Sequence, residues 1–497
     1  MKQCEVCSGE EAKAGYSDCV LLQASYILAG LAMMLNIRLS YSSAPYALIR
    51  FRLPENLFSV FVRRMASSLE LWCLPSMLLG NIMDLGVKSA MLSSGLQDNA
   101  DESRLWKFIV ITCPSIICQW LNFLTYVMLL VVYLIGGDQG RLTTFYWTIA
   151  ISGFVFGINM TLVYSADYNY IPVYIAGENS FPALTSFIHY LTTLMFGNRR
   201  KHNSDYLIVC VDIVVAIIIS FVAAVVWSVA YGYYAGTYPD PGTGDDLTNN
   251  LKHIFANAFD ASTRWTQISP FLMIVVGMGL VYAIYPGIAP GMIVPFYLID
   301  KIEMVLLIAT FFPPVIIALL QKYPETKKYS PKTIVLQHLN WKFGGWDLYH
   351  EDDTGGQKDT SKPVHAYFYH FFDILLIIKI TLAYIFIYSL HYRDSKLSRA
   401  IVNQPKMSTF LSIVFYMCHE FLLALGFSGF IGNNGGDLIL IPQYIGALFM
   451  IFLAFYSEGY IIEYKSHDPA HWPTEGMTKW NAFCYWCKRA SKIKFAT

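Results

Sequence analysis

The chain has 497 residues, of which 55% are hydrophobic, 16% aromatic and only 14% charged. So few charges do not suit a large wetted surface, and they favour a protein whose solvent is mostly lipid. Its 35 Lys and Arg residues balance its 35 Asp and Glu residues, so there is no net positive charge to gather nucleic acid. We therefore expect a membrane protein with the lipid bilayer, and no nucleic acid, as a partner.

Residues 1–19 form a polar N-terminal tail that contains Glu5, Glu10, Glu11 and Asp18. A secretory signal instead begins with a positively charged segment, so we expect the first apolar run to act as its own signal anchor. About eleven apolar runs follow, each of roughly 20 residues and long enough to cross a bilayer as a helix. They cover 20–37, 65–86, 108–135, 142–165, 168–196, 206–235, 268–290, 292–320, 368–391, 408–432 and 438–463.

This spacing predicts an all-α, polytopic membrane protein built from two bundles. Six helices lie in 20–235 and five in 268–463, the second bundle carrying a polar loop at 321–367. A polar linker at 236–267 joins the bundles, and 464–497 form a C-terminal tail. The linker and the loop have no apolar core, so neither is predicted to be a soluble domain. The sequence has no Walker-type phosphate loop, which leaves facilitated or ion-coupled movement of a solute.

Charged residues within the apolar runs are the first candidates for a functional site, because burying a charge in lipid is costly. The densest group is Asp300, Lys301 and Glu303, in which the two carboxylates share one helical face. Such a pair can hold a polar solute or a proton. The other interpretation places these residues in the wet headgroup region at the start of the helix.

Glu178 and His189 lie three turns apart in the fifth run, so they share one side of that helix. Glu178 is the stronger candidate, because an isolated buried histidine is more often held by a neighbouring helix than used as a ligand. Further charges within or near the runs rank lower, and Lys379 among them must pair with another helix or extend to the interface. These lower-ranked residues are Asp373, Lys379, His419, Glu420 and Glu458.

Two other patterns stand out along the chain. Pro286, Gly287 and Pro290 fall within six residues, and we expect them to end one helix before the next begins. Cys4-x-x-Cys7 and Cys484-x-x-Cys487 would supply four thiolates for zinc. An odd number of spans places the two pairs on opposite sides of the membrane, so we predict no metal site and no cofactor. Redox chemistry, acylation or no role remain open for each pair.

Four short segments resemble the equilibrative nucleoside transporter family. Residues 30–36 are similar to that family's Gly-x-x-x-Leu-Pro-Trp-Asn, with Asn36 at the place of the final Asn. Residues 170–179 resemble its Tyr-x-x-x-x-x-x-Gly-Gln-Gly, with Glu178 at the place of the Gln. Residues 284–288 resemble its Phe-Pro-Gly/Ala-hydrophobic ending, and 296–300 its Phe-Asn-x-x-Asp, with Asp300 as the Asp. The chain is also similar in character to the divergent, Tpr-related membrane proteins of piroplasm parasites.

The resemblance implies eleven helices in a six-plus-five, major-facilitator-like arrangement. It also implies a nucleoside or nucleobase as solute, bound by Asn36, Glu178, Asp300 and Glu303. The sequence departs from the family where Leu35 replaces Trp, where Glu178 replaces Gln, and where Glu303 and Met304 replace Gly-Arg. In the family that Arg works with the Asp on sugar hydroxyls, so these departures concern the choice of substrate.

We therefore predict a multi-pass transporter, in the plasma membrane, for a small polar metabolite. Proton coupling through Glu178 or Glu303 stays open. One alternative is a membrane or scaffold protein that has a transporter fold with a degenerate site. Another is a membrane-embedded enzyme using His189, His370 or His419, for which the sequence offers no metal-spaced histidine cluster.

Overall fold

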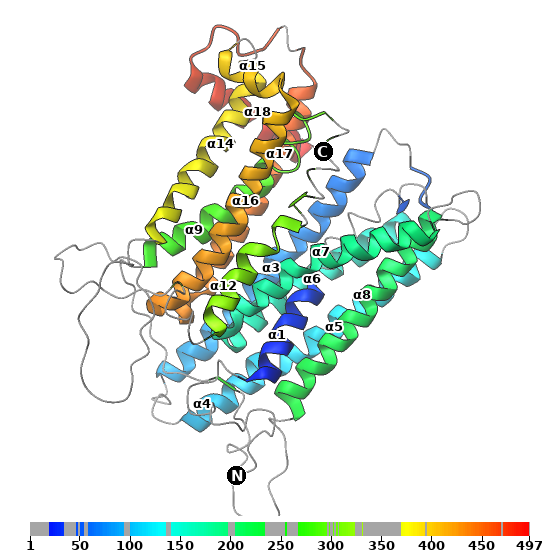
Figure 1. Cartoon of the computed structure of the whole chain (residues 1–497), viewed down its shortest axis with the longest axis vertical. Coiled ribbons are helices and arrows are strands. Elements are labelled where there is room, and N and C mark those ends of the chain that lie inside the picture. Colours follow the sequence, from blue (N-terminus) through cyan, green and yellow to red (C-terminus); the bar gives the residue numbers. More distant parts are fainter. Residues whose placement is uncertain are drawn as a thin grey trace, which may run out of the picture. The chain divides into compact units, whose positions relative to one another are not determined.

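The computed structural model places most of the apolar part of the chain. It describes residues 19–33, 46–47, 50–53, 58–93, 100–135, 141–196, 204–233, 254–255, 267–295, 298, 302, 305–306, 308–323, 331, 369–392, 395–468 and 471–496. Every regular element within these residues is a helix (Figure 1). The chain divides into two compact units. Unit 1 comprises residues 1–263, 314–327 and 434–441, and unit 2 comprises 264–313, 328–433 and 442–497.

Unit 1 is built from long helices and short irregular turns. The long helices are α1 (Val20–Met33), α3 (Phe58–Ser93), α5 (Cys113–Leu134), α6 (Leu142–Ala166), α7 (Ile171–Phe196) and α8 (Ser204–Ser228). Shorter elements are α4 (Ala100–Lys107), the π-turns η5 (Phe108–Thr112) and η7 (Val229–Tyr233), and the 3₁₀ turns η6 (Tyr168–Tyr170) and η12 (Gly436–Leu438). Most of α12 (Phe312–Lys322) also belongs to unit 1.

Glycines let the helices of unit 1 pack at very short range. On α6, a side chain at Gly153 would collide with the backbone of Leu69 on α3, and one at Gly157 would collide with Cys73 and Ser76. Small residues at helix contacts are typical of membrane bundles, because the surrounding lipid is as apolar as the side chains. Close backbone packing replaces the hydrophobic effect as the force that holds these helices together.

Unit 2 contains α9 (Ile268–Gly279), α10 (Val281–Ile284), α14 (Asp373–His391), α15 (Lys396–Val402), α16 (Pro405–Phe430), α17 (Leu440–Lys465) and α18 (Lys479–Ala496), with α17 entering the unit at residue 442. The turns η10 (Tyr369–Phe372) and η11 (Ile431–Gly435) flank α14 and α16. The helix α10 ends immediately before Tyr285-Pro286, and residues 285–294 form turns, as the two prolines and the glycine predicted.

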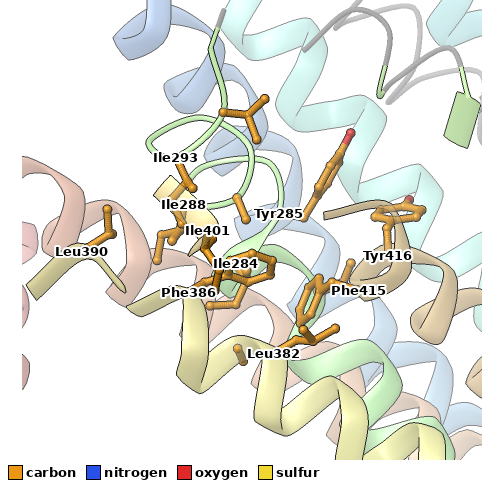
Figure 2. Close-up of a cluster of buried hydrophobic side chains, with 14 of the residues drawn as sticks. Ile284, Tyr285, Ile288, Ile293, Leu382, Phe386, Leu390, Ile401, Phe415 and Tyr416 are labelled. Atoms are coloured by element: carbon orange, nitrogen blue, oxygen red, sulfur yellow. The ribbon is translucent and has the colours of Figure 1, made fainter. Parts of the chain in front are cut away.

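An apolar cluster fills the space around these turns in unit 2 (Figure 2). Ile284 and Ile288 pack there with Phe386 of α14 and Phe415 of α16, all of them buried. Several apolar side chains on one irregular segment are thus buried at once. This burial holds the non-helical backbone in place at the end of α10.

Six helices in the described part of the chain are long and apolar enough to cross a membrane. They are Glu102–Leu134, Leu142–Ala166, Tyr206–Gly232, Asp373–His391, Pro405–Asn433 and Gly436–Lys465. Shorter apolar helices cover Val20–Met33, Ile268–Ile284 and Phe312–Lys322. The prediction of an all-α, polytopic membrane protein is confirmed for the described residues.

Candidate functional site

Of the four residues predicted to bind a solute, the structure places Glu178. Asn36, Asp300 and Glu303 lie outside the described residues. Glu178 lies in α7 and is buried, with 8% of its surface exposed. The side chain of His189 on the same helix is also outside the described part. The stripe expected from Glu178 and His189 therefore stays a prediction.

The backbone around Glu178 is held by close packing between α7 and α1. A side chain on Gly30 of α1 would collide with the carbonyl oxygen of Tyr174, one turn before Glu178. A side chain on Gly177 would collide with the carbonyl oxygen of Ile27. These two glycines are part of the segments that resemble the nucleoside transporter motifs, and here they bring two helix backbones together next to the carboxylate.

Tyrosines surround Glu178 inside unit 1. Glu178 interacts electrostatically with Tyr164 of α6 and with Tyr174 of α7, whose ring centroids lie 5.3 Å apart. Tyr126 of α5 is near enough to Tyr174 to interact with it as well. The buried hydroxyl of Tyr174 has no hydrogen-bond partner among the described residues. The carboxylate therefore lies near tyrosine side chains of two helices, α6 and α7.

The helix α5 has a polar side buried in the unit and an apolar side exposed. The buried side carries Gln119, Asn122 and Tyr126, spaced by three or four residues so that they form one stripe. Ile117 and Leu124 on the other side are 59% and 47% exposed. This is the reverse of a water-soluble helix, and it is expected when lipid surrounds the bundle and polar groups face its interior.

The polar stripe of α5 is only partly satisfied by hydrogen bonds. The amide of Asn122 and the hydroxyl of Tyr126 both donate to the carbonyl oxygen of Ala32, at 3.4 and 2.7 Å. Ala32 precedes Met33, the last residue of α1 that the structure describes. The buried amide of Gln119 makes no hydrogen bond within the described residues.

A second aromatic group in unit 1 is contributed by α1, η6, α8 and η7. The ring of Tyr26 stacks on Tyr170 with centroids 5.0 Å apart, and its hydroxyl lies 3.0 Å from that of Tyr231. Trp227 packs between Tyr26 and Tyr231 and donates from its indole nitrogen to the hydroxyl of Ser115 at 3.0 Å. All four rings are buried inside unit 1.

Asp167 follows the end of α6 and begins the η6 turn. Its Oδ1 accepts hydrogen bonds from the backbone and side-chain nitrogens of Asn169, at 3.0 and 2.9 Å. Burial raises the pKa of Asp167 to about 6, against the opposing effects of these hydrogen bonds and of Lys107. The group therefore titrates at a pH at which ordinary aspartates are fully ionised.

Unit 2 buries a lysine inside a membrane-spanning helix. Lys379 of α14 has no exposed surface, and its Nζ donates to the carbonyl oxygen of Gly277 at 2.5 Å. The same oxygen lies 2.8 Å from Nδ1 of His419 on α16, so Nδ1 carries the proton in this contact. Gly277 is in the last turn of α9, which Leu280 separates from α10.

Other charged and aromatic groups complete the surroundings of Lys379. Its Nζ lies 5.3 Å from the centroid of the Phe415 ring, and Glu420, 4% exposed, interacts with it electrostatically. The Lys379 site thus comprises Lys379, His419, Glu420 and the Gly277 carbonyl, contributed by three helices of unit 2. Ionisable groups brought together at membrane depth can take up a proton or bind a polar group of a solute.

Sequence reasoning ranked Lys379, His419 and Glu420 low because they lie in separate runs and form no motif. A signal was nevertheless present. Lys379 is six residues from the start of the nineteen-residue helix Asp373–His391. Its ammonium group is therefore too far from the end of the helix to reach the membrane surface easily. Pairing with His419 and Glu420 follows from the packing of α14 and α9 on α16, which the linear sequence does not show.

Comparison with known proteins finds no family model and no curated protein that matches the chain. Among solved structures, the fold is similar to that of the major facilitator superfamily proton:xylose symporter XylE bound to 6-bromo-6-deoxy-D-glucose. The similarity covers 96% of this chain and 94% of that one, with 11% sequence identity and a TM-score of 0.45.

Proposed function

We propose that the protein is a membrane transporter that moves a small polar solute across the bilayer. The observation that supports this most directly is the reversed polarity of the helices. Carboxylate, amide and hydroxyl groups are buried within each unit and the Lys379 ammonium group within unit 2, whereas apolar side chains such as Ile117 and Ile377 are exposed. Polar groups are costly inside a membrane and normally serve a substrate or ion path.

The substrate we propose is a nucleoside or nucleobase. The resemblance of four segments to nucleoside transporters supports this choice, as does the group of buried aromatic rings in unit 1 around Tyr26. Glu178 is proposed to bind the solute together with Asn36, Asp300 and Glu303. The proposed location is the plasma membrane, where uptake of such metabolites takes place.

Proton coupling is proposed for the Lys379 site. A buried lysine that shares a carbonyl oxygen with a histidine, close to a buried glutamate, offers three groups that exchange protons. When Lys379, His419 or Glu420 gains a proton, the electrostatic interaction with the other two groups changes. Solute movement coupled to this site would respond to a pH difference across the membrane.

Uptake of labelled adenosine, uridine and hypoxanthine into cells without their own nucleoside uptake tests the proposal. We expect saturable entry with the unchanged protein, and a fall of at least about tenfold with Glu178→Gln, because that change removes a charge-assisted contact of about 1.5 to 3 kcal/mol. Glu475→Gln is the matched control, since Glu475 is exposed outside the spans.

The controls decide between the competing functions. All variants must reach the cell surface in equal amounts before uptake is compared. Absence of uptake for all three solutes by surface-expressed protein would contradict the nucleoside proposal and favour another solute or a scaffold role. Uptake that is indifferent to an imposed pH gradient would contradict proton coupling alone.

A further inference from the structure

The last helix, α18, lies against the ends of two membrane-spanning helices. His391 is the final residue of α14, and its ring centroid is 4.8 Å from that of Trp486 on α18. Nε of Arg489 contacts Oε1 of Glu463, near the end of α17, at 2.6 Å. A side chain on Gly459 of α17 would collide with the carbonyl oxygen of Ala490. These contacts hold α18 beside the membrane boundary at which α14 and α17 both end.

An aromatic group surrounds this contact and is typical of a membrane–water interface. Tyr464 and Trp472 pack with centroids 4.8 Å apart, and Trp472 lies 5.8 Å from Trp486. The hydroxyl of Tyr460 lies 2.8 Å from Nε2 of His391. Tyrosine and tryptophan gather at the headgroup level because one end of each side chain is apolar and the other polar.

The side of α18 that faces away from the protein is apolar. Trp480 and Phe483 are 70% and 58% exposed, and their rings stack with centroids 5.6 Å apart. Cys484 is exposed and Cys487 half-buried on the same side, since residues three, four and seven positions apart share a helical face. Ala482, Trp486 and Ala490 form the opposite side, which is buried against unit 2.

Positive charge borders this apolar stripe. The helix α18 contains Lys479, Lys488, Arg489, Lys492 and Lys494 and no acidic residue, although the chain as a whole is neutral. Arg489 is paired with Glu463, and Lys479 lies 5.9 Å from the ring of Tyr388. Lys488 and Lys492 are exposed, one turn apart, on the row that continues from Trp480 and Cys484.

We propose that α18 is a binding site for anionic phospholipid headgroups on the surface of the membrane that the protein spans. Trp480 and Phe483 enter the boundary between headgroups and acyl chains, and Lys488 and Lys492 bind the headgroup phosphates. An amphipathic helix with lysines beside aromatic residues binds a membrane surface in this way. Because α18 already packs on α14 and α17, it lies at headgroup depth in the folded protein and need not become ordered when it binds lipid.

The test uses the full-length protein in nanodiscs of phosphatidylcholine, with or without roughly one third phosphatidylserine. The thiol of Cys484 is labelled with an uncharged, water-soluble maleimide, and labelling of the peptide that contains Cys484 is followed by mass spectrometry. We expect labelling to be roughly 25-fold slower in the anionic discs, because the contributions of the two lysines multiply. Each lysine contributes about fivefold to binding of the anionic surface, which corresponds to about 1 kcal/mol.

Lys488→Gln with Lys492→Gln should label equally fast in both kinds of disc. Lys396→Gln with Lys406→Gln is the matched control, because it removes two exposed charges from α15 and α16, near the same end of α14. The control should label like the unchanged protein. Equal labelling of the unchanged protein in both discs would overturn the proposal. The exposed side of α18 with Trp480 and Phe483 would then be interpreted as a surface for a protein partner. Equal effects of the two double variants would overturn it too, because the lipid effect would then be non-specific.

Discussion

At the scale of single residues, the best-defined feature is a charge buried where lipid would exclude it. Lys379 has no exposed surface, and its ammonium group is held by a backbone carbonyl oxygen, the face of an aromatic ring and the field of Glu420. Removing one member of a buried charge pair costs several kcal/mol, whereas removing both costs much less. The surroundings of Lys379 therefore predict that its contribution depends on Glu420.

A double-mutant cycle tests this dependence. We expect Lys379→Met and Glu420→Gln each to lower the free energy of unfolding, and the double variant to recover roughly 1 to 3 kcal/mol relative to their sum. Thermal unfolding in a mild detergent provides the measurement. Lys396→Met, at an exposed site on α15, is the control and should not couple to Glu420→Gln. Strictly additive effects of Lys379→Met and Glu420→Gln would show that the two charges do not interact.

Asp167 predicts a pH dependence of stability. Its pKa in the folded protein is about 6 because of burial, against an ordinary value of 3.8. Below pH 4 the folded and unfolded states both bind the proton, so burial carries no charge cost. As the pH rises through 6, the folded state must bury the charge or retain the proton. Stability is therefore lost between about pH 4 and 6, by roughly 3 kcal/mol.

Asp167→Asn should abolish this loss, because the amide is the same size and its oxygen still accepts from Asn169. Thermal unfolding at pH 4.5 and 7.5 measures the effect, and the variant should be the more stable protein at the higher pH. If the unchanged protein and the variant respond equally to pH, Asp167 is ionised in the folded state at both values.

At the scale of helices, glycine positions determine which pairs pack. Gly30 and Gly177 let the backbones of α1 and α7 pack closely beside Glu178. Gly153 and Gly157 allow the same close packing between α6 and α3. A glycine inside a helix lowers the free energy of unfolding by about 0.5 to 1 kcal/mol relative to alanine. Glycine is therefore expected where the close helix contact that it allows stabilises the protein by more than this amount. Loss of such a contact is expected to move α7 and the carboxylate that it carries.

Two glycine variants separate close packing from helix propensity. Gly177→Val should lower the free energy of unfolding by at least about 3 kcal/mol, because its side chain meets the carbonyl oxygen of Ile27. Gly86→Ala on α3 is the control, since no atom lies within 4 Å of the added carbon. That control should leave stability unchanged or raise it by about 0.5 kcal/mol. Tolerance of Gly177→Val would contradict the close contact of α1 and α7.

At the scale of the whole molecule, each unit exposes apolar side chains and buries several polar groups within its apolar core. The exposed residues of α5 and α14 include Ile117, Leu124 and Ile377, whereas Gln119, Asn122 and Lys379 are buried. A water-soluble protein with this distribution would aggregate, but in lipid the exposed side chains are solvated and the buried groups gain partners. The reversed pattern is the physical basis for proposing a path for a polar solute.

The class of protein follows from composition and hydropathy. Low charge and long apolar runs suffice for an all-α membrane protein, because a helix is the way a single segment satisfies its backbone in lipid. The cost of a buried charge also made Glu178 a candidate for solute binding, and the structure shows that Glu178 is buried. Both inferences use local composition, which the linear sequence contains.

The contacts between residues far apart in the chain follow from the tertiary structure and cannot be read from the sequence. Lys379, His419 and Gly277 share one oxygen atom across three helices, although more than a hundred residues separate Gly277 from the other two. The aromatic ring of Trp486 reaches the end of α14 in the same way. Helix rotation and pairing depend on small differences in side-chain packing, since lipid and apolar side chains are nearly equivalent surroundings, and hydropathy is insensitive to those differences.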